Sequence, residues 1–357
     1  MSCWLVSPRF DIGFFVAPGI LSVLILFLSP DELVYGTDLP IWGWVLLVVL
    51  IDVSHVYASL YRTYFDSEEF RRRRGLYLSV PLAVFLGGVI LYSIDGLFFW
   101  RVLAYTAVLH FIRQQYGFMA LYKYRSGERD KWELHLDRWL IYMTMLYPLA
   151  YWHTHLPRKF VWFIEGDFFS APVVEVVQWM GWIYLLLMTT YLLKEVWFIW
   201  SGRPLNPGKH LVMITTALVW YIGIVQYNSD YSFTVTNVVI HGVPYMALVW
   251  LYCRRKWMGQ ATHSWLHTIS RPTWVMGFVG ILCILAFVEE GIWDLLVWGD
   301  HPMVFGGIDG AWIDGSDLLV IIVPLLVLPQ ATHYILDAFI WKLNASNPDL
   351  KAYLFGD

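Results

Sequence analysis

Ten separated stretches of this sequence are each long and apolar enough to cross a lipid bilayer as a helix. The hydrocarbon core of a bilayer is about 30 Å thick, and roughly 20 helical residues cross it. We therefore expect an all-α, polytopic transmembrane helical bundle of about ten helices, forming a single domain over residues 1–357. The expected spans lie at residues 11–29, 41–62, 77–95, 97–122, 137–153, 174–198, 210–227, 232–253, 273–293 and 317–341.

Composition supports this class and argues against others. Hydrophobic residues make up 58% of the chain and charged residues only 15%, a balance that is typical of membrane proteins. The formal net charge of −4 argues against nucleic acid as a partner, because binding nucleic acid needs a basic surface. The three cysteines, Cys3, Cys253 and Cys283, show no spacing typical of a metal site or a disulfide framework.

The basic residues gather in alternate connections between the apolar runs. Of 24 Lys and Arg residues, 20 lie in the segments 1–10, 62–75, 123–138, 194–209, 254–271 and 342–351. Short basic loops stay on the cytoplasmic side of a membrane. We therefore expect both termini to be cytoplasmic, and we expect the chain to lie in a bacterial inner membrane.

Four histidines lie inside apolar runs, one in each: His55, His110, His241 and His333. They stand 7, 13, 13 and 9 residues from the next basic residue at the cytoplasmic end, which is a depth of roughly 10–20 Å. A polar side chain at membrane depth is costly, faces the bundle interior and usually marks a function. We expect the four imidazoles to meet in the cytoplasmic half of the bundle, although polar groups that only join helices would give the same pattern.

Each of these histidines has a polar residue three or four positions away, on the same helix face. These residues are Asp52 in DVSH, Gln114 in HFIRQ, Asn237 in NVVIH, and Gln330 and Asp337 in QATHYILD. A histidine that binds a metal usually donates its second ring N–H to a carboxylate or an amide. The spacing predicts a metal site of the four histidines with Asp52 and Asp337 as oxygen ligands, and with the three amides as hydrogen-bond partners.

Other polar residues near the histidines are candidates for supporting roles. Arg113, one turn from His110, needs an acid or an anion nearby, unless its long side chain reaches a water-filled cytoplasmic funnel. Candidate hydrogen-bond donors beside the metal are Tyr57, Tyr116, Tyr245 and Tyr334. By contrast, we expect His263 and His267 to lie in a solvated turn.

Three or four imidazoles with one or two carboxylates suit iron, zinc or copper, and open positions favour oxygen-activating non-haem iron. The apolar helices favour a lipid-like substrate from the bilayer, such as a fatty-acyl chain, an isoprenoid or a carotenoid. We also expect a redox partner. In its architecture and its four buried histidines the chain resembles the integral-membrane histidine-metal oxygenases, and most of all the Brp/Blh-type carotene-cleaving dioxygenases. The resemblance implies iron held by single histidines of a helical bundle.

Two departures bear on that resemblance. The HxxHH box of membrane fatty-acid desaturases and hydroxylases is missing, and the one HxxxH spacing, His263 with His267, stands in a connection between apolar runs. The DxxH and HxxxD pairs here stand on separate helices. Two other functions therefore stay open. One is an electron carrier whose histidines are axial ligands of haem, and the other is a proton- or metal-coupled transporter with Asp52, His333 and Asp337 as its relay.

Overall fold

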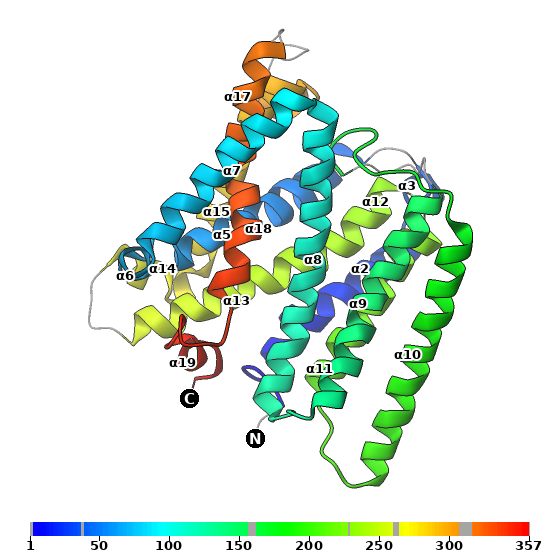
Figure 1. Cartoon of the computed structure of the whole chain (residues 1–357). Coiled ribbons are helices and arrows are strands. Elements are labelled where there is room, and N and C mark those ends of the chain that lie inside the picture. Colours follow the sequence, from blue (N-terminus) through cyan, green and yellow to red (C-terminus); the bar gives the residue numbers. More distant parts are fainter. Residues whose placement is uncertain are drawn as a thin grey trace. The chain divides into compact units, whose positions relative to one another are not determined.

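The computed structural model describes residues 3–36, 39–155, 162–227, 229–259, 264–306 and 316–356 (Figure 1). Within these ranges every regular element is a helix, and no strand occurs. The expected all-α class is therefore confirmed. His263, which we expect in a solvated turn, lies outside the described residues.

Seven helical segments are long and apolar enough to cross a membrane, which supports a membrane protein. They are Pro8–Leu28, Ile41–Arg62, Arg74–Ile94, Val174–Trp200, Pro207–Gln226, Asp230–Met258 and Pro272–Trp298. A bent pair, Asp317–Leu326 and Leu328–Ile340, makes an eighth if it is one span. The predicted spans at 97–122 and 137–153 are also helices, but they carry more polar side chains, such as Arg101 and Asp137. The count of ten therefore stays a prediction.

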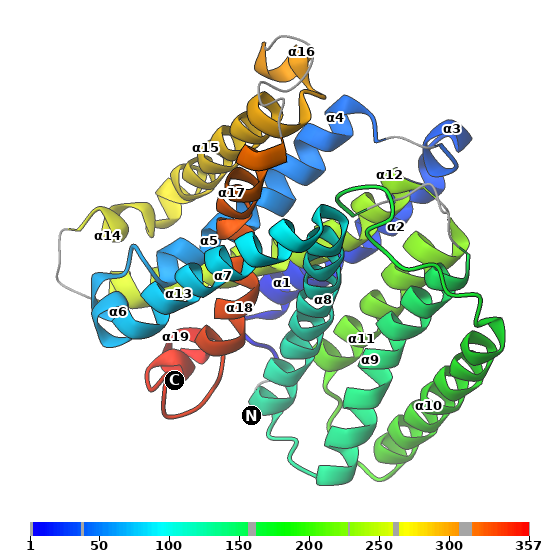
Figure 2. The same ribbon diagram turned by 45° about the horizontal axis from the view of Figure 1, so that its top comes forward.

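The chain divides into two compact units, of which the first comprises Met1–Leu39 and Val108–Val243. In this unit α9 packs against both α10 and α11 (Figures 1 and 2). Helix α8 (Gly96–Ser126) ends in the first unit, and α13 (Val239–Met258) begins there. The other elements of the unit are α1 (Pro8–Asp11), η1 (Ile12–Val16), α2 (Ala17–Leu28), α3 (Asp31–Val34), α9 (Lys131–Thr154), α10 (Val174–Trp200), α11 (Pro207–Trp220), η3 (Tyr221–Gln226), α12 (Asp230–Phe233) and η4 (Thr234–Val238).

A buried cluster of charges joins four helices of the first unit. Asp137 on α9 is fully buried and accepts hydrogen bonds from Lys123 of α8 and, at 2.7 Å, from Lys194 of α10. Lys209 of α11 lies 3.6 Å from Asp137 and 3.0 Å from Glu128. Burial alone would raise the pKa of Glu128, but Lys209 and Asn206 outweigh burial and lower this pKa. Opposite charges thus compensate one another where water is excluded.

We predict that Asp137→Asn destabilises the protein strongly. The substitution leaves buried ammonium groups without their shared carboxylate, which costs about 3–5 kcal/mol. Thermal denaturation in detergent should show the loss, whereas the exposed Glu175→Gln on α10 should leave the midpoint unchanged. Equal midpoints for the two variants would contradict this role of Asp137.

The second unit comprises Pro40–Ala107 and Pro244–Asp357. Here α7 packs along α17 and α18, α15 packs against η2 and α5, and α5 also contacts α18 (Figure 2). The elements are α4 (Ile41–Gly43), η2 (Trp44–Val53), α5 (Ser54–Arg62), α6 (Ser67–Arg72), α7 (Arg74–Ile94), α14 (Trp265–Ile269), η5 (Pro272–Trp274), α15 (Val275–Trp293), η6 (Asp294–Trp298), α16 (Pro302–Phe305), α17 (Ser316–Leu326), α18 (Leu328–Ile340) and α19 (Leu350–Phe355).

The last apolar run bends inside the second unit. Between α17 and α18 the helix axis turns by 43°, and Pro329 stands in the first turn of α18. Proline lacks the N–H for the helical hydrogen bond, and its ring clashes with the carbonyl one turn earlier, so a helix kinks there. The bend sets the direction of α18, which carries His333.

Candidate metal centre

His110 of α8 and His241 of α13 form a pair within the first unit. Their ring centroids are 5.0 Å apart at an interplanar angle of 83°, and the two residues are only 6% and 0% exposed. The ring of Phe111 stacks on that of His241, with the centroids 3.6 Å apart. The stacking fixes the plane of the His241 imidazole.

Gln115 ties these two helices together. Its side-chain N–H donates to the carbonyl of Ile240 at 3.0 Å, and its oxygen accepts from the Thr216 hydroxyl of α11 at 3.2 Å. Same-face spacing from His110 predicts Gln114 instead, whose amide has no hydrogen-bond partner among the described residues. The sequence does contain a hint of this contact, because two glutamines, Gln114 and Gln115, follow one another. Helical periodicity alone does not indicate which of the two side chains faces α13.

His55 of α5 and His333 of α18 form the corresponding pair in the second unit. Their ring centroids also lie 5.0 Å apart, at 77°, and the residues are 1% and 2% exposed. The ring of Tyr245 from α13 packs edge-on against both, with centroid distances of 5.8 Å to His55 and 5.1 Å to His333. Three helices of this unit therefore meet at the pair.

A chain of hydrogen bonds sets the tautomer of His333. Tyr245 donates its hydroxyl hydrogen to Asp337 at 2.6 Å, so the Tyr245 oxygen accepts from the Ser59 hydroxyl at 3.0 Å. Ser59 in turn accepts from Nδ1 of His333 at 2.6 Å. This order places the ring proton of His333 on Nδ1 and leaves Nε2 with the lone pair that a metal needs.

All four histidines belong to one group. Each offers one ring nitrogen, and these nitrogens lie within 4.8 Å of one another. Two nitrogens bound to one ion at about 2.0–2.2 Å are at most about 4.4 Å apart, so shifts of a few tenths of an ångström would bring the set into bonding range. A buried group of four imidazoles thus fits a single metal ion.

The carboxylates that were predicted as oxygen ligands stand one layer further out. Asp52 lies 3.6 Å from Nδ1 of His55, and Asp337 lies 3.7 Å from Nδ1 of His333. The group of mutually close ligand atoms in the described chain holds the histidines and neither aspartate. This geometry suits acids that orient the imidazoles, and direct ligation by either acid stays a prediction.

Several of the other predicted residues have partners away from the histidines. Tyr57 hydrogen-bonds to Glu289, and Tyr116 accepts from Arg138 at 3.1 Å. Gln330 and Tyr334 hydrogen-bond to each other, and the ring centroid of Tyr334 lies 5.9 Å from that of His333. A supporting role of these four residues at the histidines stays a prediction.

Two more predicted residues are also directed elsewhere. Arg113 is exposed, in contrast to the buried His110 three residues before it. Asn237 donates to Thr236 and to the carbonyl of Phe233. Asn237 lies in the π-helical segment η4, whose turns are wider than those of an α-helix. The four residues from Asn237 to His241 thus begin in a π turn and continue in α-helix, and a role of Asn237 at His241 stays a prediction.

A π-helical segment also precedes His55, because η2 ends at Val53. Such segments are uncommon and occur often at functional sites. In both units they lie just before a histidine of the group. Sequence spacing, which assumes regular α-helix, could not have revealed them.

Comparison with models of known protein families, with curated proteins and with solved structures finds no match.

We predict that Ser59→Ala and Tyr245→Phe weaken metal binding without removing the site. Both substitutions break the chain that holds His333 in one tautomer, and partners of ligating histidines typically contribute roughly 10–100-fold in affinity. Competition with a chelator should measure the change. Ser79→Ala, in which an exposed hydroxyl of α7 is removed, is the control. Unchanged affinity in both Ser59→Ala and Tyr245→Phe would contradict the hydrogen-bond order.

Proposed function

We propose that this chain is a membrane-embedded non-haem iron oxygenase, or a related oxidoreductase, acting on an apolar lipid-like substrate. The observation that carries the proposal is the buried group of four histidine nitrogens within 4.8 Å of one another. Imidazole nitrogens with carboxylates close by suit iron that keeps open coordination positions. When bound there, ferrous iron supplies the activation of molecular oxygen.

The chain's own residues have three tasks in this proposal. The imidazoles hold the ion, and Ser59 keeps His333 in the tautomer that ligates through Nε2. Tyr245 and Asp337 complete that hydrogen-bond chain. The burial of all four histidines excludes water from the centre, which protects a reactive oxidant from side reactions.

The lipid-like substrate follows from the surroundings of the centre. Seven segments are apolar enough to lie in a bilayer, and a substrate dissolved in that bilayer reaches the bundle without crossing water. In line with the resemblance to Brp/Blh-type enzymes, we include carotenoid and isoprenoid chains in this class. Oxidative cleavage or oxygenation of such a chain is the reaction that we propose.

The close approach of the four nitrogens favours a bare ion over haem. A porphyrin ring is wide and flat, and two axial histidines must lie on its opposite faces. In a group whose nitrogens are all within 4.8 Å, the remaining two imidazoles occupy the space that the porphyrin would need. A strong Soret band in the purified protein would nevertheless establish haem and overturn the iron proposal.

For the location we propose a bacterial inner membrane, with ten spans and both termini in the cytoplasm. The support is the gathering of 20 of the 24 basic residues in alternate connections, since basic loops are retained in the cytoplasm. A reporter that is active only in the cytoplasm, fused after the last residue, should be active. A periplasm-specific reporter that is active at this position would overturn the orientation.

We predict that replacing His55, His110, His241 or His333 singly with Ala abolishes activity and lowers the bound metal by roughly tenfold or more, because each removes one ligand. Elemental analysis of the purified variants measures the metal. The exposed His155→Ala and the His267→Ala variant should keep the wild-type content. Unchanged metal content in all four variants, or the absence of metal from the wild type, would refute the shared site.

A further inference from the structure

Arg62, the last residue of α5, is a buried cation without an acidic partner in contact. It is 2% exposed, and none of the described carboxylates forms an ion pair with it. Its guanidinium donates to two neutral acceptors, the carbonyl of Ile340 and, at 3.4 Å, the side-chain oxygen of Asn347. It also lies over the rings of Tyr252 and Trp341, 4.2 and 4.7 Å from their centroids. No contact neutralises this positive charge.

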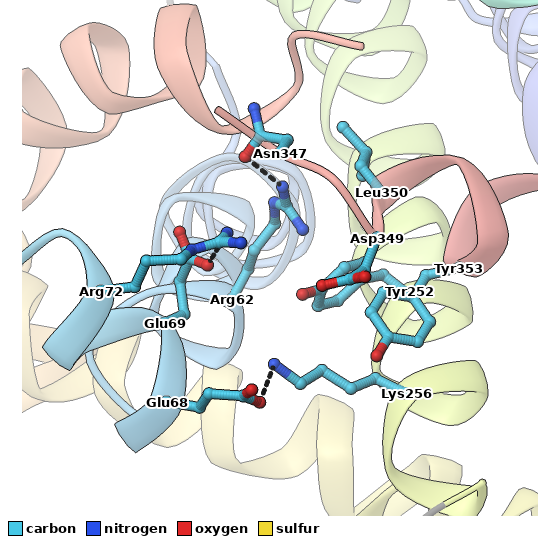
Figure 3. Close-up of a pocket in the computed structure, with 10 residues that line it drawn as sticks. All are labelled: Arg62, Glu68, Glu69, Arg72, Tyr252, Lys256, Asn347, Asp349, Leu350 and Tyr353. Atoms are coloured by element: carbon cyan, nitrogen blue, oxygen red, sulfur yellow. Dashed lines mark hydrogen bonds and ion pairs between the residues drawn. The ribbon is translucent and has the colours of Figure 1, made fainter. Parts of the chain in front are cut away.

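On one side Arg62 lines a small polar cavity of about 30 Å³ (Figure 3). The cavity lies among the basic segments 62–75, 254–271 and 342–351, on the proposed cytoplasmic side. The other charged side chains around it are three carboxylates and two cations: Glu68, Glu69, Asp349, Arg72 and Lys256. Apart from Arg62 the lining is therefore net negative, so it attracts metal cations from solution.

On its other side Arg62 is separated from His333 by two aromatic rings. Trp341 packs on the guanidinium, and its indole N–H donates to the hydroxyl oxygen of Tyr245 at 3.4 Å. The ring centroid of Tyr245 lies 5.1 Å from that of His333. Arg62 also interacts electrostatically with Asp337, the acid beside His333. Along this path an ion from the cavity reaches the histidine only by passing the guanidinium.

A fixed positive charge on such a path opposes the passage of a divalent cation. Little water screens the repulsion, because Arg62 is buried and the local dielectric constant is low. In aquaporin-type channels an arginine excludes cations in the same way. Entry and exit cross the same barrier, so both are slowed. The affinity for the ion depends only on its free and bound states, in which the ion is farther from Arg62.

The C-terminal segment holds Arg62 in this position. Asn347 is buried and accepts hydrogen bonds from Arg62 and Arg73. Its amide donates to two backbone carbonyls, at 2.9 and 2.8 Å. Leu350 and Leu354 of the following helix α19 are also buried. Packing of this segment therefore keeps the acceptor of Arg62 beside the guanidinium.

We propose that Arg62 is an electrostatic barrier between the cavity of Figure 3 and the metal centre, which keeps the bound ion from exchanging with cations in solution. No bond is made or broken in this role. The inference rests on the proposed function, because it needs an ion at the histidines. It adds a residue that controls how fast this ion enters and leaves.

Isotope exchange measures the barrier directly. Protein loaded with natural ferrous iron is mixed anaerobically with an excess of a heavier stable iron isotope, and mass spectrometry of the desalted protein reports the exchanged fraction. Arg62→Gln removes the charge but keeps N–H donors, whereas Arg62→Lys keeps the charge. We expect exchange roughly tenfold faster or more in Arg62→Gln and close to the wild-type rate in Arg62→Lys. Iron affinity should be equal in all three proteins.

The matched control is Arg254→Gln, which removes an exposed cation of α13 from the same unit and should leave the exchange rate unchanged. Equal acceleration in Arg62→Gln and Arg62→Lys would show that packing, and not charge, limits exchange, and would overturn the proposal. If both Arg62 variants misfold, Tyr252→Leu decides, because it removes the nearer ring that holds the guanidinium. We expect faster exchange in this variant, and an unchanged rate would overturn the barrier.

The outcomes separate this inference from the proposed function. Wild-type protein without bound iron would refute both. Iron at full occupancy, with equally fast exchange in wild type, Arg62→Gln and Arg254→Gln, would leave the metal centre standing and refute the barrier.

Discussion

The cost of placing polar imidazoles among apolar helices is the constraint on which this structure depends. A polar group in a bilayer must face the bundle interior and find partners there. His55, His110, His241 and His333 are all almost completely buried, and their nitrogens lie close together. Helix packing, the bend before α18 and the π-helical segments before His55 and His241 are the features that position these rings.

Side chains of neighbouring helices hold each pair of imidazole rings in place within its own unit. Gln115 joins α8 to the backbone next to His241, and Phe111 stacks on the same ring. Ser59 and Tyr245 hold His333 through a directed chain of hydrogen bonds. In both cases the supporting groups come from neighbouring helices. Precise positioning of a metal ligand needs such support.

Much of this was predictable from sequence, and what was not predictable has a common cause. The apolar runs predicted helices, and the cost argument selected the four histidines that form the group. Spacing of three or four residues assumes a regular α-helix, whereas Asn237 lies in a π-helical segment and donates to Thr236 and Phe233. Spacing also indicated Gln114, whereas Gln115 makes the hydrogen bonds to α13 and α11. It gave no indication of Ser59, which hydrogen-bonds to His333. Periodicity specifies a face of one regular helix, but which helix packs on that face is a tertiary property.

The central claim is that the four histidines grip one ion, and X-ray absorption at the metal edge of the purified protein tests it most directly. The account predicts one iron per chain with nitrogen and oxygen neighbours at roughly 2.0–2.2 Å, together with the outer-shell scattering that imidazole rings produce. A spectrum with sulfur neighbours, a porphyrin pattern, or too little metal to measure would contradict it.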